Sequence, residues 1–374
     1  MSVLDDVNLH RTELKTDSYT TTISDLLGTY KRGDLRIDPE YQRLFRWNLE
    51  RQSEYIESLL LNIPTPPLFF ATNPDGKSEV IDGLQRLSTL IKFFAPEVYE
   101  GDVRIAIAED NEQEQNNLRV ATMLLGAPLV NSIEGYTVKT LPEALVRILR
   151  YTRIPVILLE KESSTRARYH VFKRLNRSGS VLSDQEIRNC SARLFGNDFP
   201  QALRILAAEA EVRSAIGLPE EQMRKMAVEE YLLKLLANLY SPDPLKHSVV
   251  EFLDDFMQYG SEGKFALDDE KKQLVLRTFG LLAKVLPNGE AFRYRKSGEA
   301  KGSVSPNLFE IVAYGVAKNI DSLEQHPEFL KQRVIEMHDA DELKELTGAG
   351  SNTKKKYLGR LELGMKWFSE REVI

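Results

Sequence analysis

The fold is decided around residues 80–90, which read VIDGLQRLSTL. The two apolar residues before Asp82 are typical of the end of a buried strand. Gly83 permits a sharp turn, and from Leu84 onward the apolar residues have helical spacing. The stretch therefore predicts a strand that ends at Asp82, a turn at Gly83 and a helix that continues to Phe94.

A β-hairpin is predicted directly before this corner. The short runs 68–71 and 78–81 have strand character and flank Asn73-Pro74-Asp75-Gly76, which is a strong hairpin-turn sequence. A helix is predicted over residues 49–61 from its apolar spacing. Three prolines, at positions 64, 66 and 67, end that helix because proline cannot donate to the helical ladder.

Further elements are expected on both sides of the hairpin. Ser24 is predicted to cap a helix that ends at Gly33, ahead of an extended stretch over residues 35–37. Residues 154–159 are predicted to form a buried strand that leads into a helix from about Ser164 to Leu175.

The pattern of the chain changes near residue 190. Before it, short β-like runs alternate with helices, and residues 97–150 have the character of an insertion with one or two helices. After it, nearly every periodic segment is helical, with proline and glycine between the segments. We therefore expect an α+β protein, with a mixed α/β domain over 1–190 and an all-helical domain over 191–374.

Composition narrows the function classes. The 374 residues include 50 Lys and Arg against 56 Asp and Glu, a formal charge of −6, which argues against a nucleic-acid coat over the whole surface but allows a local basic site. The single cysteine, Cys190, excludes a disulfide framework and multi-cysteine metal sites. No apolar run approaches the roughly 18–20 residues of a membrane span, and the start lacks a signal-peptide apolar region. We expect a cytosolic protein without membrane contact.

The corner at Asp82 offers groups for phosphate chemistry. Unpaired amides and the dipole at a helix N-terminus attract anions, and Gln85 and Arg86 fall in the first turn, where Arg86 could add a bidentate clamp. Asp82 could hold a metal, orient a hydroxyl or cap the helix. The alternative is a capped strand–helix junction in which Arg86 is paired to a carboxylate, and spacing alone leaves both interpretations open.

A second cluster precedes the hairpin, where residues 38–47 read DPEYQRLFRW. Consecutive aromatic, amide and guanidinium groups suit ring stacking and phosphate contact. Alternatively, Tyr41, Phe45 and Trp47 fill one face of the core while the arginines face water, and their spacing of two supports that alternative.

A third cluster lies on and after a basic helix, where residues 172–179 read FKRLNRSG. Gly179 suits a left-handed turn, and Ser183 with Glu186 forms a capping box for the next helix. These local roles do not account for Asn176, which lies between Arg174 and Arg177.

The three clusters together resemble a known family. Tyr-Gln-Arg with a downstream Trp stands at 41–47, Asp-Gly-x-Gln-Arg-Leu-x-Thr-Leu at 82–90, and Phe-x-x-Leu-Asn-x-x-Gly with a later Leu-Ser at 172–183. In this order and approximate spacing they resemble the N-terminal domain of GmrSD-type modification-dependent restriction enzymes, in the ParB/sulfiredoxin superfamily. Residues 291–293 and 307–310 are also similar to stand-alone members of that family.

The resemblance implies a nucleotide pocket. Asp82, Gln85 and Arg86 would form a catalytic corner at the phosphates of an NTP, with Gly83 permitting close backbone approach. Further pocket residues would be Tyr41, Gln42, Arg43, Arg174, Asn176 and Arg177. Asn176 would also help to hold Mg²⁺, which phosphate chemistry requires and which needs few protein ligands.

Two departures from the family pattern limit the expected activity. Leu84 stands where the family usually has Gln, which makes NTP hydrolysis less certain than nucleotide binding. The late histidines are scattered and lack the context of an HNH nuclease, so we expect no nuclease activity from this chain. A nuclease effector on a separate chain would be the natural complement.

Two functional hypotheses follow. The first is a nucleotide-binding, NTP-hydrolysing sensor or regulator of a DNA-defence system, for which Arg86→Ala should abolish nucleotide binding at a nearly unchanged melting temperature. The second is a non-enzymatic module that binds DNA through Arg166–Arg177 or docks a partner protein. DNA binding of this kind weakens steeply as salt rises.

Overall fold

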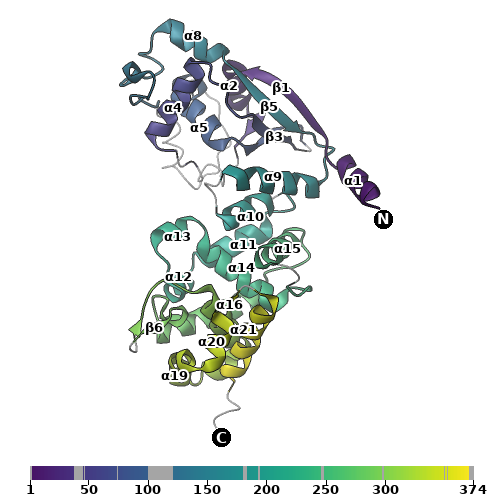
Figure 1. Ribbon diagram of the computed structural model, residues 1–374, viewed down its shortest axis with the longest axis vertical. Coiled ribbons are helices and arrows are strands. Elements are labelled where there is room, and N and C mark those ends of the chain that lie inside the picture. The colour runs from purple at the N-terminus through teal and green to yellow at the C-terminus, as the bar shows by residue number, and fades with distance from the viewer. Residues whose placement is uncertain are drawn as a thin grey trace. The chain divides into compact units, whose positions relative to one another are not determined.

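The computed structural model describes residues 2–37, 45, 47–73, 75–99, 121–179, 183–192, 194–245, 248–296, 299–348, 350–351 and 353–369. The chain divides into two compact units, residues 1–180 and 181–374. Figure 1 shows a sheet with helices in the first unit and a set of helices in the second. The predicted boundary at residue 190 falls inside a helix of the second unit, α10 (Asp184–Ala192).

The first unit is built on a mixed five-stranded sheet with the order β1-β5-β3-β4-β2. The pairs β1–β5 and β3–β4 are antiparallel, and β3–β5 and β2–β4 are parallel. This mixed pairing, with helices around it, confirms the expected α+β class. The strands are β1 (Thr16–Thr22), β2 (Leu35–Arg36), β3 (Leu68–Thr72), β4 (Ser78–Asp82) and β5 (Arg153–Leu159).

The predicted hairpin is confirmed as β3 and β4. Its register shifts between Phe69 and Phe70, so that Phe69 pairs with Asp82 while Phe70 pairs with Val80. Such an irregularity changes the direction of the strand locally. The irregularity lies at the end of β4 and therefore helps to set the direction of the Asp82 side chain.

The helices of the first unit are α1 (Val3–Thr12), α2 (Ile23–Lys31), α4 (Leu49–Leu60), α5 (Leu84–Phe93), α6 (Ala95–Tyr99), α8 (Glu143–Tyr151) and α9 (Thr165–Gly179). α4 and α5 contact each other, and α9 packs against β4. α5 buries Leu87, Leu90 and Ile91, as its predicted spacing requires.

One predicted helix cap is wrong. The cap of α2 is Thr22, whose Oγ1 accepts a hydrogen bond from the Asp25 amide at 3.1 Å, whereas Ser24 lies inside the helix. β1 pairs with β5 as far as Thr22, opposite Arg153. The end of that strand therefore places the helix cap two residues before Ser24.

The described part of the predicted insertion is tied to α4. The Leu125 amide donates to Oγ of Ser53 at 2.8 Å, and the Leu129 amide donates to Oε1 of Glu57 at 2.8 Å. Ser53 and Glu57 are buried. They satisfy amides of an irregular segment that would otherwise lie unpaired against the core.

Where the structure describes it, the second unit is helical apart from a short two-stranded pair, β6 (Arg295–Lys296) with β7 (Glu299–Ala300). Its α-helices besides α10 are α11 (Asp198–Ala207), α12 (Ala210–Ile216), α13 (Glu220–Arg224), α14 (Ala227–Tyr240), α15 (Val249–Ser261), α16 (Asp269–Val285), α17 (Pro306–Lys318), α18 (Ile320–Leu323), α19 (Pro327–Glu336), α20 (Asp341–Thr347) and α21 (Lys354–Trp367). In the described part of the chain, none of the helices has the length and apolar character needed to span a bilayer.

Candidate functional site

The strand–turn–helix corner forms as predicted. β4 ends at Asp82, Gly83 has φ 96° and ψ 15°, and α5 begins at Leu84. A residue other than glycine is strained in this left-handed region. Gly83 is the N-cap of α5 and has no side chain to accept from the first-turn amides. The helix N-terminus therefore keeps its partial positive charge at the corner.

Gly83 is also required by packing. A Cβ at this position would lie 2.3 Å from Cδ2 of Leu68 and 3.1 Å from Nη2 of Arg86. Neighbouring side chains, as well as the backbone angle, exclude a larger residue here. The backbone angle and the packing thus account for the glycine without a ligand.

Arg86 joins three parts of the corner. Its Nη1 donates to the carbonyl of Pro66, and its Nη2 donates to the carbonyl of Pro67 at 3.2 Å and to Oδ2 of Asp82 at 3.2 Å. The side chain is 12% exposed. The pairing of Arg86 with a carboxylate was the alternative that the sequence left open, and the structure shows it. Arg86 therefore has a structural role whatever else it binds.

Burial is the main cause of the raised pKa values of two groups, Asp82 and Tyr55, on which the Arg86 charge also acts. Burial raises the pKa of Asp82, against the opposing effects of the Arg86 charge and the Gly83 amide. Burial likewise raises the pKa of Tyr55, on α4, to about 12, and the Arg86 charge acts in the opposite direction. The Arg86 charge therefore acts on both the Asp82 carboxyl and the Tyr55 phenol.

Tyr55 is a candidate that sequence reasoning missed. Its hydroxyl is buried and has no hydrogen-bond partner among the described residues. A buried phenol usually finds a partner, so this one is suited to an incoming acceptor. Trp47 contacts the Tyr55 ring edge-on, with centroids 5.7 Å apart. The helical spacing of Tyr55 indicated only a core residue.

Gln85 connects the corner to the first motif. Its Oε1 accepts from the Trp47 amide at 3.1 Å, and the Trp47 carbonyl accepts from Nε2 of Gln52 at 2.7 Å. The end of the 38–47 segment is thereby held at α5. The predicted pocket residues Tyr41, Gln42 and Arg43 lie outside the described residues.

The third motif lies on α9, which packs against β4. Phe172 is fully buried, and Arg174 is exposed. Asn176 and Arg177 fall within the helix, but their side chains lie outside the description. The predicted capping box of α10 is confirmed: the Ser183 amide donates to Oε2 of Glu186 at 2.7 Å, and the Glu186 amide donates to Oγ of Ser183 at 3.2 Å.

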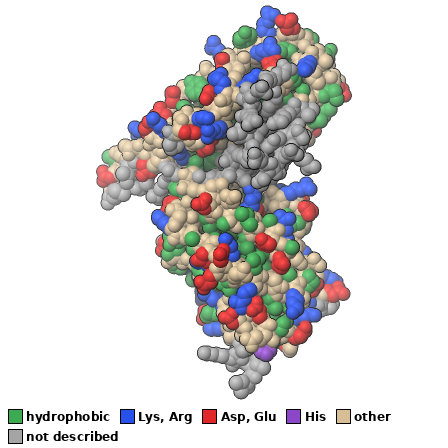
Figure 2. All heavy atoms as spheres, turned by 180° about the vertical axis from the view of Figure 1, so that it is seen from behind, with side chains coloured by type: hydrophobic (Ala, Val, Ile, Leu, Met, Phe, Trp, Pro, Cys, Tyr) green, Lys and Arg blue, Asp and Glu red, His purple; other side chains and the backbone are tan. Residues whose placement is uncertain are grey.

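One residue of the predicted DNA-binding helix serves the fold. Arg168 is buried, and its Nη2 donates to the carbonyls of Thr72 at 2.7 Å and Glu160 at 3.0 Å. Arg168 is therefore occupied by the fold, and the DNA contact expected of Arg166–Arg177 would depend on the other basic residues of that stretch. On the face of the second unit seen in Figure 2, basic and acidic side chains are interspersed.

The late motif around Glu310 is also structural. Oε2 of Glu310 accepts from Nε of Arg360 at 2.6 Å, and Oε1 accepts from Nζ of Lys234 at 3.2 Å. All three side chains are buried. Removing one partner of such a buried pair would leave an uncompensated charge, so the helical unit depends on keeping these side chains paired.

The described residues offer limited ligands for a metal. They contain no group of three or more His, Cys, Asp or Glu side chains that could hold an ion. Asp82 supplies a partly buried carboxylate at the corner. One carboxylate fits Mg²⁺ that is bound chiefly through phosphates and water.

The α+β domain was compared with models of known families. Residues 23–192 match the family model described as GmrSD restriction endonuclease, N-terminal domain. This match confirms, for residues 23–192, the resemblance seen in the three motifs. No curated protein and no solved structure gives a match to the chain.

Proposed function

We propose that the N-terminal unit binds a nucleoside triphosphate with Mg²⁺, and that the chain regulates a restriction-like DNA-defence system through a separate effector. The family match supports the defence role. Three features support the nucleotide: the N-terminus of α5, the Arg86 guanidinium, and the Tyr55 hydroxyl on α4, which has no partner among the described residues.

The Tyr55 hydroxyl carries the proposal. The fold accounts for Gly83, Gln85 and Arg86 by packing and hydrogen bonds, but the described residues leave the buried phenol unsatisfied. A phosphate oxygen would accept a hydrogen bond from this hydroxyl and would also be attracted by the Arg86 guanidinium. The base and the metal would then involve residues of the first and third motifs.

Asp82 would change partner when phosphate binds. Without a ligand its carboxylate is paired with Arg86. A phosphate at Arg86 would compete for that guanidinium and leave the carboxylate to orient a water of the Mg²⁺ shell or the attacking water. This is the role by which Asp82 would contribute to hydrolysis.

The decisive variant is Tyr55→Phe, tested by calorimetric titration of the full-length chain with ATP and GTP in the presence of Mg²⁺. It removes a hydroxyl that has no partner among the described residues, so the melting temperature should be unchanged or slightly raised. We expect nucleotide affinity to fall roughly tenfold, the effect of about 1.4 kcal/mol. Phosphate release measures hydrolysis in parallel.

Ser88→Ala is the matched control, because Ser88 is a buried hydroxyl on α5 that also has no described partner. It should leave affinity unchanged. Arg86→Ala is a poor test on its own, since it leaves Asp82 and two prolyl carbonyls unsatisfied and should cost about 2–3 kcal/mol of stability. The sequence predicted a nearly unchanged melting temperature for Arg86→Ala, whereas these contacts predict a lower one. Arg86→Lys keeps the positive charge but removes the guanidinium. If both Tyr55→Phe and Arg86→Lys bound nucleotide with wild-type affinity, the proposal would be contradicted.

The second candidate is DNA binding by α9, and the exposure of Arg174 favours it. With Arg168 buried, fewer basic side chains of this helix can reach a phosphate backbone. The smaller number of contacts predicts weaker binding and a shallower dependence on salt.

A further inference from the structure

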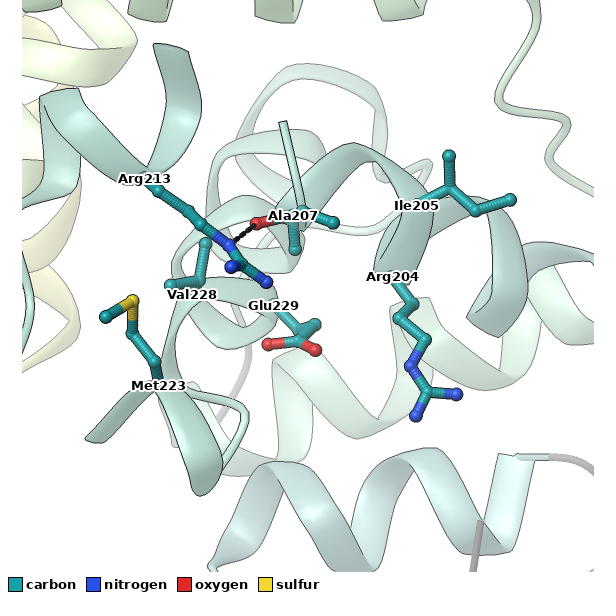
Figure 3. Close-up of a pocket in the computed structure, with 8 residues that line it drawn as sticks. Arg204, Ile205, Ala207, Arg213, Met223, Val228 and Glu229 are labelled. Atoms are coloured by element: carbon teal, nitrogen blue, oxygen red, sulfur yellow. Dashed lines mark hydrogen bonds between the residues drawn. The ribbon is translucent and has the colours of Figure 1, made fainter. Parts of the chain in front are cut away.

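The pocket of the second unit is balanced in charge. It has a volume of about 240 Å³ and lies between α11, α12, α13 and α14. Figure 3 shows the Glu229 carboxylate between the side chains of Arg213 and Arg204. The charges of Arg204, Arg213 and Glu186 all act on Glu229. Two positive and two negative groups thus leave no excess charge among the described residues there to bind an ion.

A free set of backbone groups lies in the first unit, along β1. This strand is at the edge of the sheet and pairs only with β5 among the described strands. Its seven residues keep one continuous register with β5, and residues 16–20 are exposed. Figure 1 shows β1 along the border of the sheet, with α1 beyond its N-terminal end. The strand has no proline, lysine or bulge, which are common protections of an exposed edge.

The hydrogen bonds at the two ends of β1 show which residues face outward. The Lys15 carbonyl accepts from the Glu160 amide at 3.0 Å, and the Ile23 amide donates to the Thr152 carbonyl at 3.2 Å. Because the N–H and C=O groups of successive strand residues point to opposite sides, the odd-numbered residues face β5. The groups that face away from the sheet are therefore those of Thr16, Ser18 and Thr20.

Asp17 covers one position of this free edge. Its Oδ1 accepts from the Ser18 amide at 2.8 Å. An amide that faced β5 would be bonded to that strand, so this contact agrees with the outward direction of Ser18. The N–H and C=O groups of Thr20 have no partner among the described residues. The edge therefore has the donors and acceptors to add a further strand.

We propose that β1 pairs with β1 of a second copy of this chain, antiparallel and around a twofold axis at Tyr19. In this register each residue lies opposite the one at equal distance on the other side of Tyr19, so that all seven residues are paired. Ser18 and Thr20 of the two copies would exchange N–H···O=C bonds, as their outward direction requires. This inference concerns the edge of the sheet and stands independently of the proposed nucleotide site.

The side chains along β1 suit such self-pairing. The two Tyr19 rings would lie opposite each other at the axis, and threonine or serine would lie opposite threonine. Pairs of these kinds stabilise antiparallel strands. Asp17 would lie opposite Thr21 and four residues from its own counterpart, so like charges would not face each other.

Exposed apolar side chains at both ends of β1 favour a second copy over an unrelated strand. At the N-terminal end, α1 exposes Val3 and Leu4. At the other end, just before the start of β5, α8 exposes Ile148 and Tyr151. Antiparallel pairing places the first end of each strand beside the second end of the other, so one twofold axis would bring both apolar groups together twice. A pair of seven-residue strands is small beside the roughly 1,000 Å² of a stable interface, so we expect a dimer that depends on protein concentration.

Sedimentation velocity of the full-length chain over a range of concentrations measures the dimer. Thr20→Pro removes an outward amide without removing a bond to β5, so the melting temperature should be nearly unchanged. Because the interface is symmetric, this variant loses two hydrogen bonds, and dimerisation should weaken roughly tenfold. Thr20→Val keeps the amide and is the matched control, which should dimerise like the wild type. Asp17→Ala frees the Ser18 amide and should strengthen dimerisation.

Cross-linking tests the register, in a Cys190→Ser background that removes the single cysteine of the chain. With oxidised glutathione, Tyr19→Cys should form a disulfide-linked dimer, because opposite residues of antiparallel strands have Cα atoms about 4.5–5.5 Å apart. Thr16→Cys should not, because its counterpart would lie six residues along the strand, roughly 20 Å away. A monomer at every concentration, wild-type dimerisation of Thr20→Pro, or equal cross-linking of the two cysteine variants would overturn the proposal. An extended segment of a different protein would then be the remaining occupant of the edge.

Discussion

The backbone amide of Trp47 donates a hydrogen bond to Oε1 of Gln85 across 3.1 Å, and this bond joins two motifs that lie 38 residues apart in the chain. On its other side Trp47 is held by Nε2 of Gln52, which donates to its carbonyl at 2.7 Å. The peptide at the end of the first motif is thus fixed against both α4 and α5. Gln85 thereby has a positioning role that its place in the motif did not reveal.

Replacing Gln85 by Leu should release Trp47 from α5. The variant loses one acceptor for a partly buried amide, so the free energy of unfolding should fall by about 1 kcal/mol. Trp47 emission should shift to longer wavelength as its surroundings become wetter. Urea unfolding and fluorescence measure the two effects.

Gln85→Glu is the control for that variant, because a carboxylate oxygen can still accept from the Trp47 amide. A Trp367→Phe background removes the emission of the second tryptophan, which lies on α21. Equal emission spectra for Gln85→Leu and Gln85→Glu would show that the bond does not position Trp47.

The sequence predicted the corner well because its signals are local. An apolar strand end, a glycine that permits φ 96° and a helical period lie within a few residues of each other. The capping box of Ser183 and Glu186 is local for the same reason. By contrast, the polar edge strand β1, TDSYTTT, has no apolar alternation, and its pairing with distant β5 supplies the structure.

The functions of individual site residues were harder to predict. The partners of Arg86 at Pro66 and Pro67 come from a loop 19 and 20 residues away, so spacing could not distinguish a phosphate clamp from a structural tie. Tyr55 had the spacing of a core residue, which it is. Only the packed structure shows that its hydroxyl is buried without a described partner.

Gly83→Ala should destabilise the first unit more than Gly76→Ala. Both glycines have positive φ, 96° and 80°, so both substitutions carry the backbone strain of about 1–3 kcal/mol. Only at Gly83 does the new Cβ collide, at 2.3 Å from Leu68, whereas nothing lies within 4 Å at Gly76. Urea unfolding measures the difference.

A double variant isolates the collision at Gly83. Leu68→Ala with Gly83→Ala should cost less than the sum of the two single changes, because the colliding methyl group is gone. The contact with Leu68 would be unimportant if the free-energy losses of Leu68→Ala and Gly83→Ala simply added in the double variant. Equal losses for Gly76→Ala and Gly83→Ala would lead to the same conclusion.

The raised pKa of Asp82 predicts that the free energy of unfolding depends on pH. Burial raises its pKa in the folded protein above the ordinary value of 3.8. At pH values between the ordinary pKa and the raised pKa of the folded protein, the folded state binds more protons than the unfolded state. The contribution of Asp82 to stability therefore falls as the pH rises through this range. Relative to the wild type, Asp82→Asn should therefore gain free energy of unfolding as the pH rises from the ordinary pKa of 3.8 through the raised pKa of the folded state. Urea unfolding at several pH values measures this, and a difference that is flat or falls with pH would contradict it.

Two arginines on α9 separate the structural from the DNA-binding role of that helix. Arg168 is buried on the carbonyls of Thr72 and Glu160, so Arg168→Met should cost about 2–3 kcal/mol of stability while retaining the apolar stem. Arg174 is exposed, so Arg174→Ala should leave the melting temperature unchanged. If α9 binds DNA, that second variant should lower the slope of log affinity against log salt by about 0.9, the value for one phosphate contact. Fluorescence anisotropy with a labelled duplex at several salt concentrations measures the slope. An unchanged slope in Arg174→Ala would remove this face of α9 from the DNA interface, and the nucleotide site would then be the remaining candidate for function in the first unit.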